Sequence, residues 1–454
     1  MKNLVILGGG ESGVGAAILG KDKGWNVFLS DFGTIPERYK ETLDSEGIEW
    51  EEGGHTMNRI LEATEVVKSP GIPPTAPVVK AVVEKGIPVI SEIELAGRYT
   101  DARMVCITGS NGKTTTTLLT HHMLVSAGID AGLAGNVGKS LALQVARDPH
   151  EVYVIELSSF QLENMYDFHA NIAVILNITP DHLDRYDYKM QNYINAKFRI
   201  LNNLTPRDAF IYWQDDPVIR RQLERIVTEA RLYPFGETRE DDKTAAWVDD
   251  EGVICIDTPA EKMRMPRADL SLNGLHNLYN SMAAALSGCI MDIDKEEIRK
   301  ALSNFEGVEH RLEPCGTIDG VRYINDSKAT NVNSTWYALE SMPRDVILIL
   351  GGKDKGNDYN EILPLVKDRV KAIVAMGVDN TKIIDFFTGK VPVVADTHSL
   401  HECVAKCREL AQNGDTVLLS PCCASFDLFN GYEDRGRKFK ALVRDMKKQE
   451  LNKA

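Results

Sequence analysis

Residues 104–115 read Met-Val-Cys-Ile-Thr-Gly-Ser-Asn-Gly-Lys-Thr-Thr, an apolar strand that runs into a glycine-rich turn. Gly109 and Gly112 allow backbone N–H groups to close on phosphate oxygens. The helix expected over 115–126 adds the positive end of its dipole at the same point. A strand before the turn and a helix after it favour nucleotide binding over a chance glycine turn.

The residues that follow the turn supply the remaining parts of a triphosphate site. Lys113 brings a mobile positive charge, and the hydroxyl of Thr114 can bind Mg²⁺. Ile107 stands where the general phosphate loop has its first glycine, so this is the shorter form Gly-x-x-Gly-Lys-Thr.

Length and composition limit the class of protein. A chain of 454 residues exceeds what one hydrophobic core usually serves, and about three domains are expected. No apolar run approaches the roughly 20 residues of a membrane span, and the first strand, 4–7, is too short for a secretory signal, so we expect a cytoplasmic protein. The net charge of −14 disfavours nonspecific nucleic-acid binding. Eight scattered cysteines favour reduced core thiols over a zinc site.

The first segment carries a second glycine pattern. Residues 4–7 form a buried-type strand, Gly8 to Gly13 follow as Gly-x-Gly-x-x-Gly, and 14–23 fit a helix. The next strand, 27–31, ends in Asp31, about 20 positions on, which is the fingerprint of a dinucleotide site. The same glycines and acid serve any nucleotide with a pyrophosphate and a ribose, so the pattern leaves the nucleotide open.

The central segment continues as a parallel sheet, with strands at 152–155 and 172–176. Glu156 follows the first of them, either as a ligand of a phosphate-bound Mg²⁺ or as an ordinary acidic strand end. His182 follows the second, as a core histidine, a neighbour of a helix cap or a ligand. Lys197 would by default be a solvated surface lysine. Only a lysine with a lowered pKa near a metal could react with CO₂ to form a carbamate, and spacing alone does not show this. Residues 209–267 suggest no chemistry.

The last segment, from about 308, again alternates strands and helices and predicts a third open sheet. Arg311 and Lys328 flank one of its strands and offer charge for a transferring phosphoryl group, and Asp326 offers a general base. The alternative is a set of solvated loop charges. A basic helix over 434–448 ends the segment, and we expect its charges to be a solvated face.

Six stretches taken together resemble the Mur ligases of bacterial cell-wall synthesis, over essentially the whole chain. They are 108–115, 156–161, 179–186, 275–277, 310–311 and 324–331. The resemblance implies an α/β protein of three domains. These are a Rossmann-like UDP-substrate-binding domain over 1–92, a P-loop ATPase-like, mostly parallel central domain over 93–307, and a Rossmann-like, amino-acid-binding open sheet over 308–454.

The resemblance also implies the reaction. Residues 325–331 are most similar to the branch of the family that adds D-glutamate, so the expected substrates are UDP-N-acetylmuramoyl-L-alanine and D-glutamate. ATP would activate the carboxylate as an acyl phosphate, two Mg²⁺ ions would assist, and the protein would act as a monomer.

The site residues that the resemblance implies fall into five groups. The ATP-binding group is Gly109, Ser110, Asn111, Gly112, Lys113, Thr114, Thr115, Asn277, Asn280 and Arg311. The UDP-substrate group is Gly10, Ser12, Gly13, Asp31, Ser69, Asn136 and His182. The D-glutamate group is Thr330, Lys355, Ser425 and Tyr432. The metal ligands are Thr114, Glu156, His182 and a carbamylated Lys197. The catalytic group is Lys113, His182, Lys197, Asp326 and Lys328.

Three other functions compete with this one. A folylpolyglutamate synthase-like ligase shares the phosphate loop but lacks a first domain with Gly-x-Gly-x-x-Gly. An NAD-dependent oxidoreductase explains Gly8 to Asp31 and leaves the phosphate loop without a purpose. The motifs are also compatible with a noncatalytic nucleotide-sensing switch.

Overall fold

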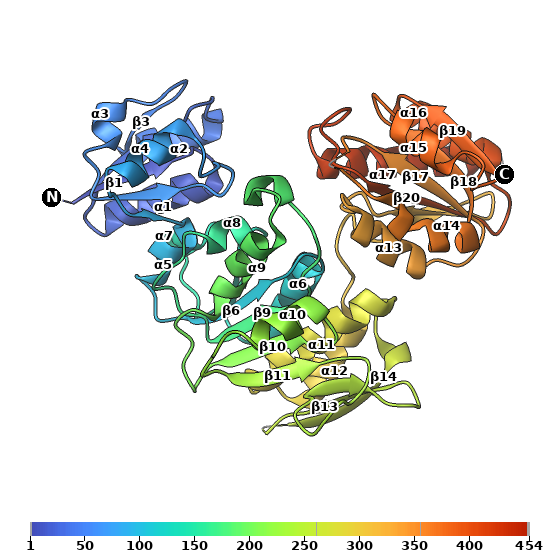
Figure 1. Cartoon of the computed structure of the whole chain (residues 1–454), viewed down its shortest axis with the longest axis horizontal. Coiled ribbons are helices and arrows are strands. Elements are labelled where there is room, and N and C mark those ends of the chain that lie inside the picture. Colours follow the sequence, from blue (N-terminus) through green and yellow to red (C-terminus); the bar gives the residue numbers. More distant parts are fainter. Residues whose placement is uncertain (1, 260, 355, 452–454) are drawn as a thin grey trace. The chain divides into compact units, whose positions relative to one another are not determined.

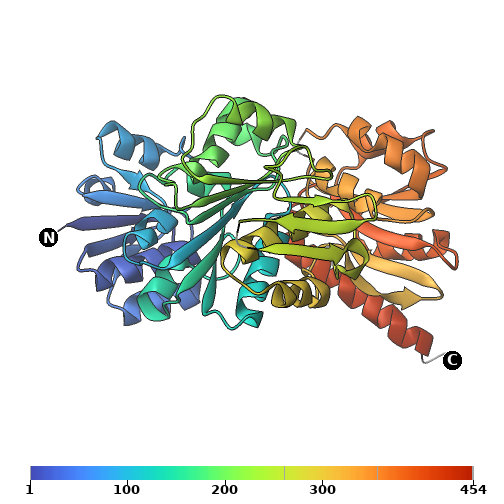
Figure 2. The ribbon, with the colours of Figure 1, turned by 90° about the horizontal axis from the view of Figure 1, so that it is seen from below.

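The computed structural model describes residues 2–259, 261–354 and 356–451. Strands in this part of the chain form three sheets, and Figures 1 and 2 show helices on both faces of the first and the third. The chain divides into two compact units. Unit 1 runs to Leu270 and includes Tyr279–Phe305, with the first and second sheets, and unit 2 comprises Ser271–Leu278 and the residues from Glu306 on, with the third sheet.

The first sheet is parallel, with the order β3-β2-β1-β4-β5. Its central strand β1 is buried on both faces, with Leu4 to Leu7 in the core, as expected where helices cover both faces of a parallel sheet. The strands are β1 (Asn3–Leu7), β2 (Asn26–Ser30), β3 (Glu49–Glu51), β4 (Glu65–Lys68) and β5 (Val89–Ile90). The helices are α1 (Glu11–Asp22), α2 (Glu37–Ser45), α3 (Met57–Ile60), α4 (Pro77–Glu84) and α5 (Glu92–Gly97).

The second sheet has the order β14-β13-β12-β11-β10-β9-β6-β8-β7 and is parallel from β7 to β12. The last two strands add to it as an antiparallel meander. The strands are β6 (Arg103–Thr108), β7 (Ala131–Gly135), β8 (Val152–Glu156), β9 (Ile172–Ile175), β10 (Ala209–Trp213), β11 (Arg231–Phe235), β12 (Ala246–Val248), β13 (Val253–Asp257) and β14 (Lys262–Pro266). The helices are α6 (Lys113–Ser126), α7 (Leu141–Arg147), α8 (Ser159–Leu162), α9 (Met190–Phe198), α10 (Pro217–Leu223), α11 (Leu275–Ile290) and α12 (Lys295–Asn304).

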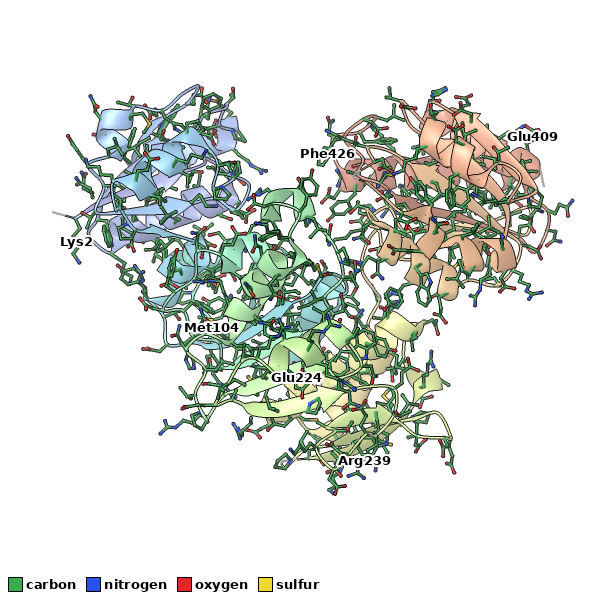
Figure 3. All side chains as sticks on the ribbon, viewed as in Figure 1. Lys2, Met104, Glu224, Arg239, Glu409 and Phe426 are labelled. Atoms are coloured by element: carbon green, nitrogen blue, oxygen red, sulfur yellow. The ribbon has the colours of Figure 1, made fainter. Side chains whose placement is uncertain are left out.

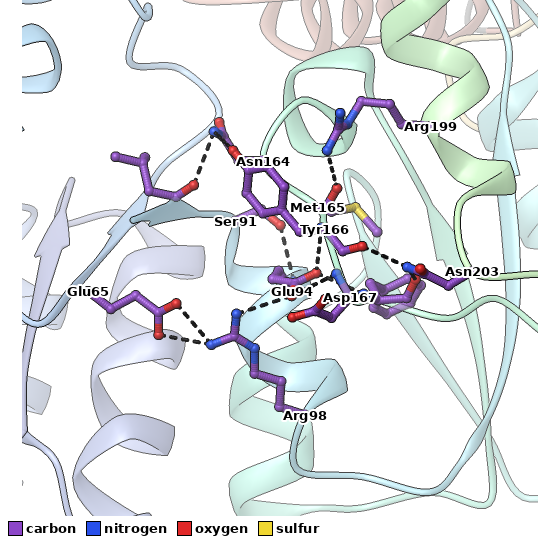
Figure 4. A network of polar contacts seen from close by, with 12 residues as sticks. Glu65, Ser91, Glu94, Arg98, Asn164, Met165, Tyr166, Asp167, Arg199 and Asn203 are labelled. Atoms are coloured by element: carbon purple, nitrogen blue, oxygen red, sulfur yellow. Dashed lines mark hydrogen bonds and ion pairs between the residues drawn. The ribbon is translucent and has the colours of Figure 1, made fainter. Parts of the chain in front are cut away.

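A buried carboxylate joins the two sheets of unit 1. Glu94 on α5 is fully buried and accepts hydrogen bonds from the backbone N–H groups of Tyr166 (2.9 Å), Asp167 (3.2 Å) and Phe168 (2.9 Å). Arg98 bridges it to Glu65 of the first sheet, as Figure 4 shows. A buried carboxylate is costly unless it is hydrogen-bonded, so these bonds stabilise the packing of α5 against residues 166–168, which precede β9 of the second sheet.

The third sheet has the order β15-β16-β20-β17-β18-β19, and only its edge strand β15 is antiparallel. The predicted third open sheet is therefore confirmed. The strands are β15 (Glu313–Ile318), β16 (Val321–Asn325), β17 (Val346–Gly351), β18 (Val370–Met376), β19 (Val393–Thr397) and β20 (Thr416–Cys422). The helices are α13 (Val332–Glu340), α14 (Leu363–Arg369), α15 (Thr381–Phe387), α16 (Leu400–Leu410) and α17 (Tyr432–Leu451).

The final helix corrects one expectation. Most charges of α17 face solvent, but Arg435 is fully buried and continues the apolar stripe of Phe439 and Val443 at intervals of four residues. Its charge is therefore not part of a solvated face.

The cysteines and the apolar side chains lie where the composition of the chain predicts. All eight cysteines are free thiols, and all but Cys315 are buried. Met104 lies buried in β6, whereas Phe426 is exposed on unit 2, as Figure 3 shows. Among the helices of the described residues, none is both long and apolar enough to cross a bilayer.

Candidate functional site

The phosphate loop lies between β6 and α6, as predicted. Gly112 is the N-cap of α6 at a φ of 83°, and a Cβ there would lie 2.3 Å from Asn280 Oδ1. Glycine is therefore required at this turn. Lys113 Nζ donates to the carbonyl oxygens of Gly109 and Ser110, both at 2.9 Å, so its ammonium group folds back over the loop.

The loop after β9 anchors the phosphate loop from the neighbouring strand. Ser110 Oγ donates to the Thr179 carbonyl at 2.8 Å. The backbone N–H of Asn111 donates to Asn177 Oδ1 at 2.9 Å, and Asn177 Nδ2 donates back to the Asn111 carbonyl at 3.0 Å. The backbone N–H of Ser110 also donates to the Asn177 carbonyl, at 2.8 Å, so these bonds hold the first half of the loop against the segment after β9. Thr114 and Thr115 are buried in the first turn of that helix.

Lys197 lies under the phosphate loop and is only 1 % exposed, so the default of a solvated surface lysine is wrong. Its Nζ donates to the Gly109 carbonyl at 2.6 Å. Burial lowers the pKa of Lys197 well below its usual value, and repulsion from Lys113 lowers it further, against the attraction of Asp181 and Glu156. A lowered pKa increases the fraction of this amine that is neutral and nucleophilic.

Glu156 ends β8 beside the phosphate loop and is 1 % exposed. Asn136 Nδ2 donates to its Oε1 at 2.7 Å, so an expected substrate residue and an expected metal ligand touch. The arrangement leaves a buried carboxylate at the carboxyl edge of the sheet, where a phosphate-bound cation needs oxygen.

His182 is the N-cap of a short 3₁₀ helix, Leu183–Tyr186, in a left-handed conformation with a φ of 52°. Its side chain is 41 % exposed, and its ring lies edge-on to Phe160 at 5.2 Å between centroids. It is therefore not a core histidine. His182 thus occupies the cap position itself rather than neighbouring it, although its side chain makes no capping hydrogen bond to that helix.

The donor set fits magnesium. Thr114 offers a hydroxyl, Glu156 a carboxylate, and a carbamate on Lys197 would offer a further anionic oxygen, all hard ligands that Mg²⁺ prefers. His182 would add a ring nitrogen to these oxygen ligands.

The first sheet carries the second glycine loop in unit 1. Asp31 Oδ2 accepts the N–H of Gly9 at 2.6 Å, and Oδ1 accepts the N–H of Gly33 at 2.7 Å. A Cβ at Gly13 would lie 1.9 Å from the Gly8 carbonyl oxygen, so glycine is required for α1 to approach the loop. A Cβ at Gly8 would meet Ser69 Oγ at 2.5 Å. Five of the seven expected UDP residues therefore lie in or beside one loop, with Gly10 as the N-cap of α1 and Ser12 in its first turn. Asn136 and His182 belong to loops of the second sheet instead.

The carboxyl edge of the third sheet carries the candidates of unit 2. Asp326 is buried, with Oδ2 accepting from Ser420 Oγ at 2.8 Å and Oδ1 from the Leu312 N–H at 3.2 Å. Burial raises the pKa of Asp326 to about 7, against the effects of the Ser420 hydrogen bond and the charge of Arg311. Lys328 Nζ stands over the ring of Tyr432, 5.3 Å from its centroid.

The other expected residues are placed as follows. Asn277 Nδ2 donates to the Asn273 carbonyl at 2.8 Å, and Asn280 Oδ1 accepts from Thr116 Oγ1 at 3.2 Å. Ser425 is buried in the loop after β20, and Thr330 precedes α13. Lys355 lies outside the described residues.

Sequence reasoning missed the buried charges Glu94 and Arg435. A signal existed for each. Ser91 and Glu94 have the spacing of a capping box, and Ser91 Oγ does accept the Glu94 N–H at 3.1 Å. Arg435 stands on an apolar helical stripe.

Three family models match the chain in order. They are "Mur ligase MurD-like, N-terminal domain" over residues 2–91, "Mur ligase middle domain" over 107–288 and "Mur ligase, glutamate ligase domain" over 310–423.

Individual relatives extend the match to the full length. The UDP-N-acetylmuramoylalanine--D-glutamate ligase of Bacteroides fragilis is 58 % identical over 98 % of this chain and 100 % of its own. That of Porphyromonas gingivalis is 57 % identical over 97 % of this chain and 98 % of its own. A solved structure of MurF ligase from Thermotoga maritima in complex with ADP is 14 % identical, covers 93 % and 95 % of the two chains, and shares the fold with a TM-score of 0.60.

Proposed function

The chain belongs to the Mur ligase family, and we propose that it joins D-glutamate to UDP-N-acetylmuramoyl-L-alanine, with ATP, in peptidoglycan precursor synthesis. The observation that carries this is the 58 % identity to a D-glutamate ligase over the whole chain. The first domain matches a MurD-like model, which disfavours a folylpolyglutamate synthase and an NAD-dependent oxidoreductase. The chain is thus an ATP-dependent acid–amino-acid ligase.

The first chemical step would activate a carboxylate, which is a poor electrophile at neutral pH. A carboxylate oxygen of the UDP substrate would attack the γ-phosphorus of ATP, the bond from that phosphorus to ADP would break, and an acyl phosphate and ADP would result. Lys113 and the N–H groups of the phosphate loop would stabilise the charge on the transferring group, and Arg311 would add a second cation. The contacts of Lys113 with Gly109 and Ser110 support this role, because they hold its ammonium group at the loop.

Thr114, Glu156, His182 and Lys197 would hold two Mg²⁺ ions. Bound there, Mg²⁺ neutralises phosphate charge during transfer. The neutral amine of Lys197 can add to CO₂, forming an N–C bond and releasing one proton, which turns a cation into an anionic oxygen ligand. The lowered pKa and full burial of Lys197 support this modification.

The second step would form the amide. The amine of D-glutamate, once deprotonated, would attack the acyl carbon, and phosphate would leave from the tetrahedral intermediate. His182 or Asp326 would take the proton. The pKa of Asp326, raised to about 7, suits a general base at neutral pH.

The remaining assignments stay proposals of the same kind. The UDP portion would lie on the loop of Gly10, Ser12 and Gly13, with Asp31 and Ser69, and Asn136 would reach the muramoyl end. Thr330, Lys355, Ser425 and Tyr432 would hold D-glutamate. The domain ranges 1–92, 93–307 and 308–454, the monomeric state and the cytoplasmic location also stay predictions.

Phosphate release from ATP tests the function. The full chain is incubated with UDP-N-acetylmuramoyl-L-alanine and a panel of amino acids that includes both enantiomers of glutamate. We expect release only when the UDP substrate and D-glutamate are both present, since a wrong partner leaves buried charged groups unpaired. Release that needs no amino acid, or that another amino acid supports better, would refute the proposal.

A further inference from the structure

Arg435 on α17 is a fully buried arginine that ties backbone segments together. Its Nε donates to Ser327 Oγ at 2.9 Å, and its Nη2 donates to the Ser327 carbonyl at 2.8 Å. Nη1 and Nη2 also donate to the Cys423 carbonyl, each at 3.3 Å, and Nη1 reaches the Gly351 carbonyl at 3.5 Å. One planar group thus contacts three separate loops.

These loops end three adjacent strands. β16, β20 and β17 are neighbours in the third sheet and run parallel, so their carboxyl ends lie at one edge. Ser327 follows β16, Cys423 follows β20, and Gly351 ends β17. The first two loops carry Asp326, Thr330 and Ser425, which are among the residues proposed to act on the amino acid or its amine, and Lys328, which is proposed to act on the phosphoryl group.

The backbone at the ends of β17 and β20 includes a strained conformation and a close approach between the two segments. Cys422 has a φ of 61°, which costs a non-glycine residue free energy. A Cβ at Gly352 would lie 2.2 Å from the Ala424 carbonyl oxygen, so the loops after β17 and β20 touch through their backbones. Lys353 and Ala424 exchange both backbone hydrogen bonds, at 2.8 and 3.2 Å. The guanidinium of Arg435 closes this arrangement from the side of α17.

The charge of Arg435 also acts at the same edge. It stabilises the ionised form of Asp326, as Arg311 does, and Asp427 is a further acidic neighbour of its guanidinium. A buried cation beside the ends of three strands favours an anionic ligand there. D-Glutamate, with two carboxylates, is such a ligand.

We propose that Arg435 is a positioning residue for the amino-acid substrate. Its guanidinium fixes the loops after β16, β17 and β20 relative to one another, so that the side chains on them meet the carboxylates of D-glutamate. The inference rests on the proposed function and adds to it the residue that sets the geometry of the amino-acid subsite.

Steady-state kinetics of the full chain test this. Arg435→Lys keeps the charge and loses the fork, Arg435→Met loses both, and Arg444→Met is the matched control because Arg444 is exposed on the same helix. For Arg435→Lys we expect KM for D-glutamate to rise about tenfold or more, since hydrogen bonds from a charged donor are lost, with KM for ATP and the UDP substrate within about twofold. For Arg435→Met we expect KM for D-glutamate to rise further, and for Arg444→Met we expect all three KM values to match those of the wild type.

Equal changes in all three KM values, or a lower thermal stability with unchanged KM for D-glutamate, would overturn the inference. Should Arg435→Met fail to fold, Ser327→Ala keeps the cation and removes one partner of its guanidinium. It should raise KM for D-glutamate about three- to tenfold.

Hydrogen exchange gives a readout that does not depend on turnover. In Arg435→Lys, the amides of 326–331 and 422–427 should exchange faster than in the wild type, with β18 and β19 unchanged. Exchange that is equally faster in the two loops and in β18 and β19, or that is unchanged in the two loops, would overturn the inference. A wild-type chain without D-glutamate-dependent phosphate release would instead remove the proposed function itself.

Discussion

Gly112→Ala tests how the phosphate loop is held. Gly112 has a φ of 83°, and an added Cβ would lie 2.3 Å from Asn280 Oδ1 and 3.2 Å from Leu176 Cδ1. A left-handed conformation costs an L-residue about 1–2 kcal/mol. Forced overpacking adds typically about 1–3 kcal/mol. We therefore expect the free energy of unfolding to fall by about 2–5 kcal/mol, together with weaker ATP binding.

Gly128→Ala is the matched control. Gly128 follows the C-cap of the same helix at a φ of 82°, and its added Cβ would meet nothing within 4 Å. In Gly128→Ala the free energy of unfolding should fall only by the cost of the left-handed conformation, about 1–2 kcal/mol. The difference between the two variants isolates the contacts with Asn280 and Leu176. Adding Asn280→Ala to Gly112→Ala should recover part of it, because contacting residues couple by about 0.5–3 kcal/mol.

Urea unfolding followed by tryptophan fluorescence measures these differences. Four of the five tryptophans, Trp25, Trp50, Trp213 and Trp247, lie in unit 1, so the signal reports mainly the unit that holds the loop. ATP binding is measured in parallel by calorimetry. The reasoning is refuted if Gly112→Ala is as stable as Gly128→Ala, or if removing the Asn280 side chain recovers nothing.

Two further predictions concern buried titratable groups. Lys197→Ala should abolish phosphate release, and added short carboxylic acids should partly restore it by replacing the carbamate; full activity without them would contradict the modification. Burial raises the pKa of Glu92 from 4.5 to about 7, although Ser140 and Ala142 donate to it. The folded state then holds a proton that the unfolded state releases, so this contribution is complete below pH 4.5 and declines by about 3 kcal/mol as pH rises through 7. Glu92→Gln should remove this slope in urea unfolding, and an unchanged slope would count against it.

The sequence predicted the parts of the fold that local patterns determine. The strands before both glycine loops, and the helices after them, are confirmed, although α1 begins at Glu11 rather than at Val14. The short strands β12 to β14 lay in a region without clear periodicity. Their pairing is antiparallel and set by neighbours in the sheet, which no local pattern encodes.

The sequence motifs predicted which residues form the candidate site, but not which of the charged side chains are buried. Lys197 and Arg435 both sit on helices rich in polar residues, where a charged side chain is by default solvated. Only the packing of α9 under the phosphate loop buries the first, and only the packing of α17 against the third sheet buries the second. Both depend on contacts between residues far apart in the sequence, so sequence position alone does not show them.

The central claim is that the carboxylate of the UDP substrate is activated by phosphoryl transfer at the phosphate loop before D-glutamate attacks. Isotope transfer tests it most directly, with ¹⁸O in the carboxylate of the alanyl residue and mass spectrometry of the phosphate released. If an acyl phosphate forms, the bridging oxygen leaves with phosphate, and each phosphate formed from a doubly labelled carboxylate should carry one ¹⁸O. Phosphate without label, at normal rates of amide formation, would contradict the account.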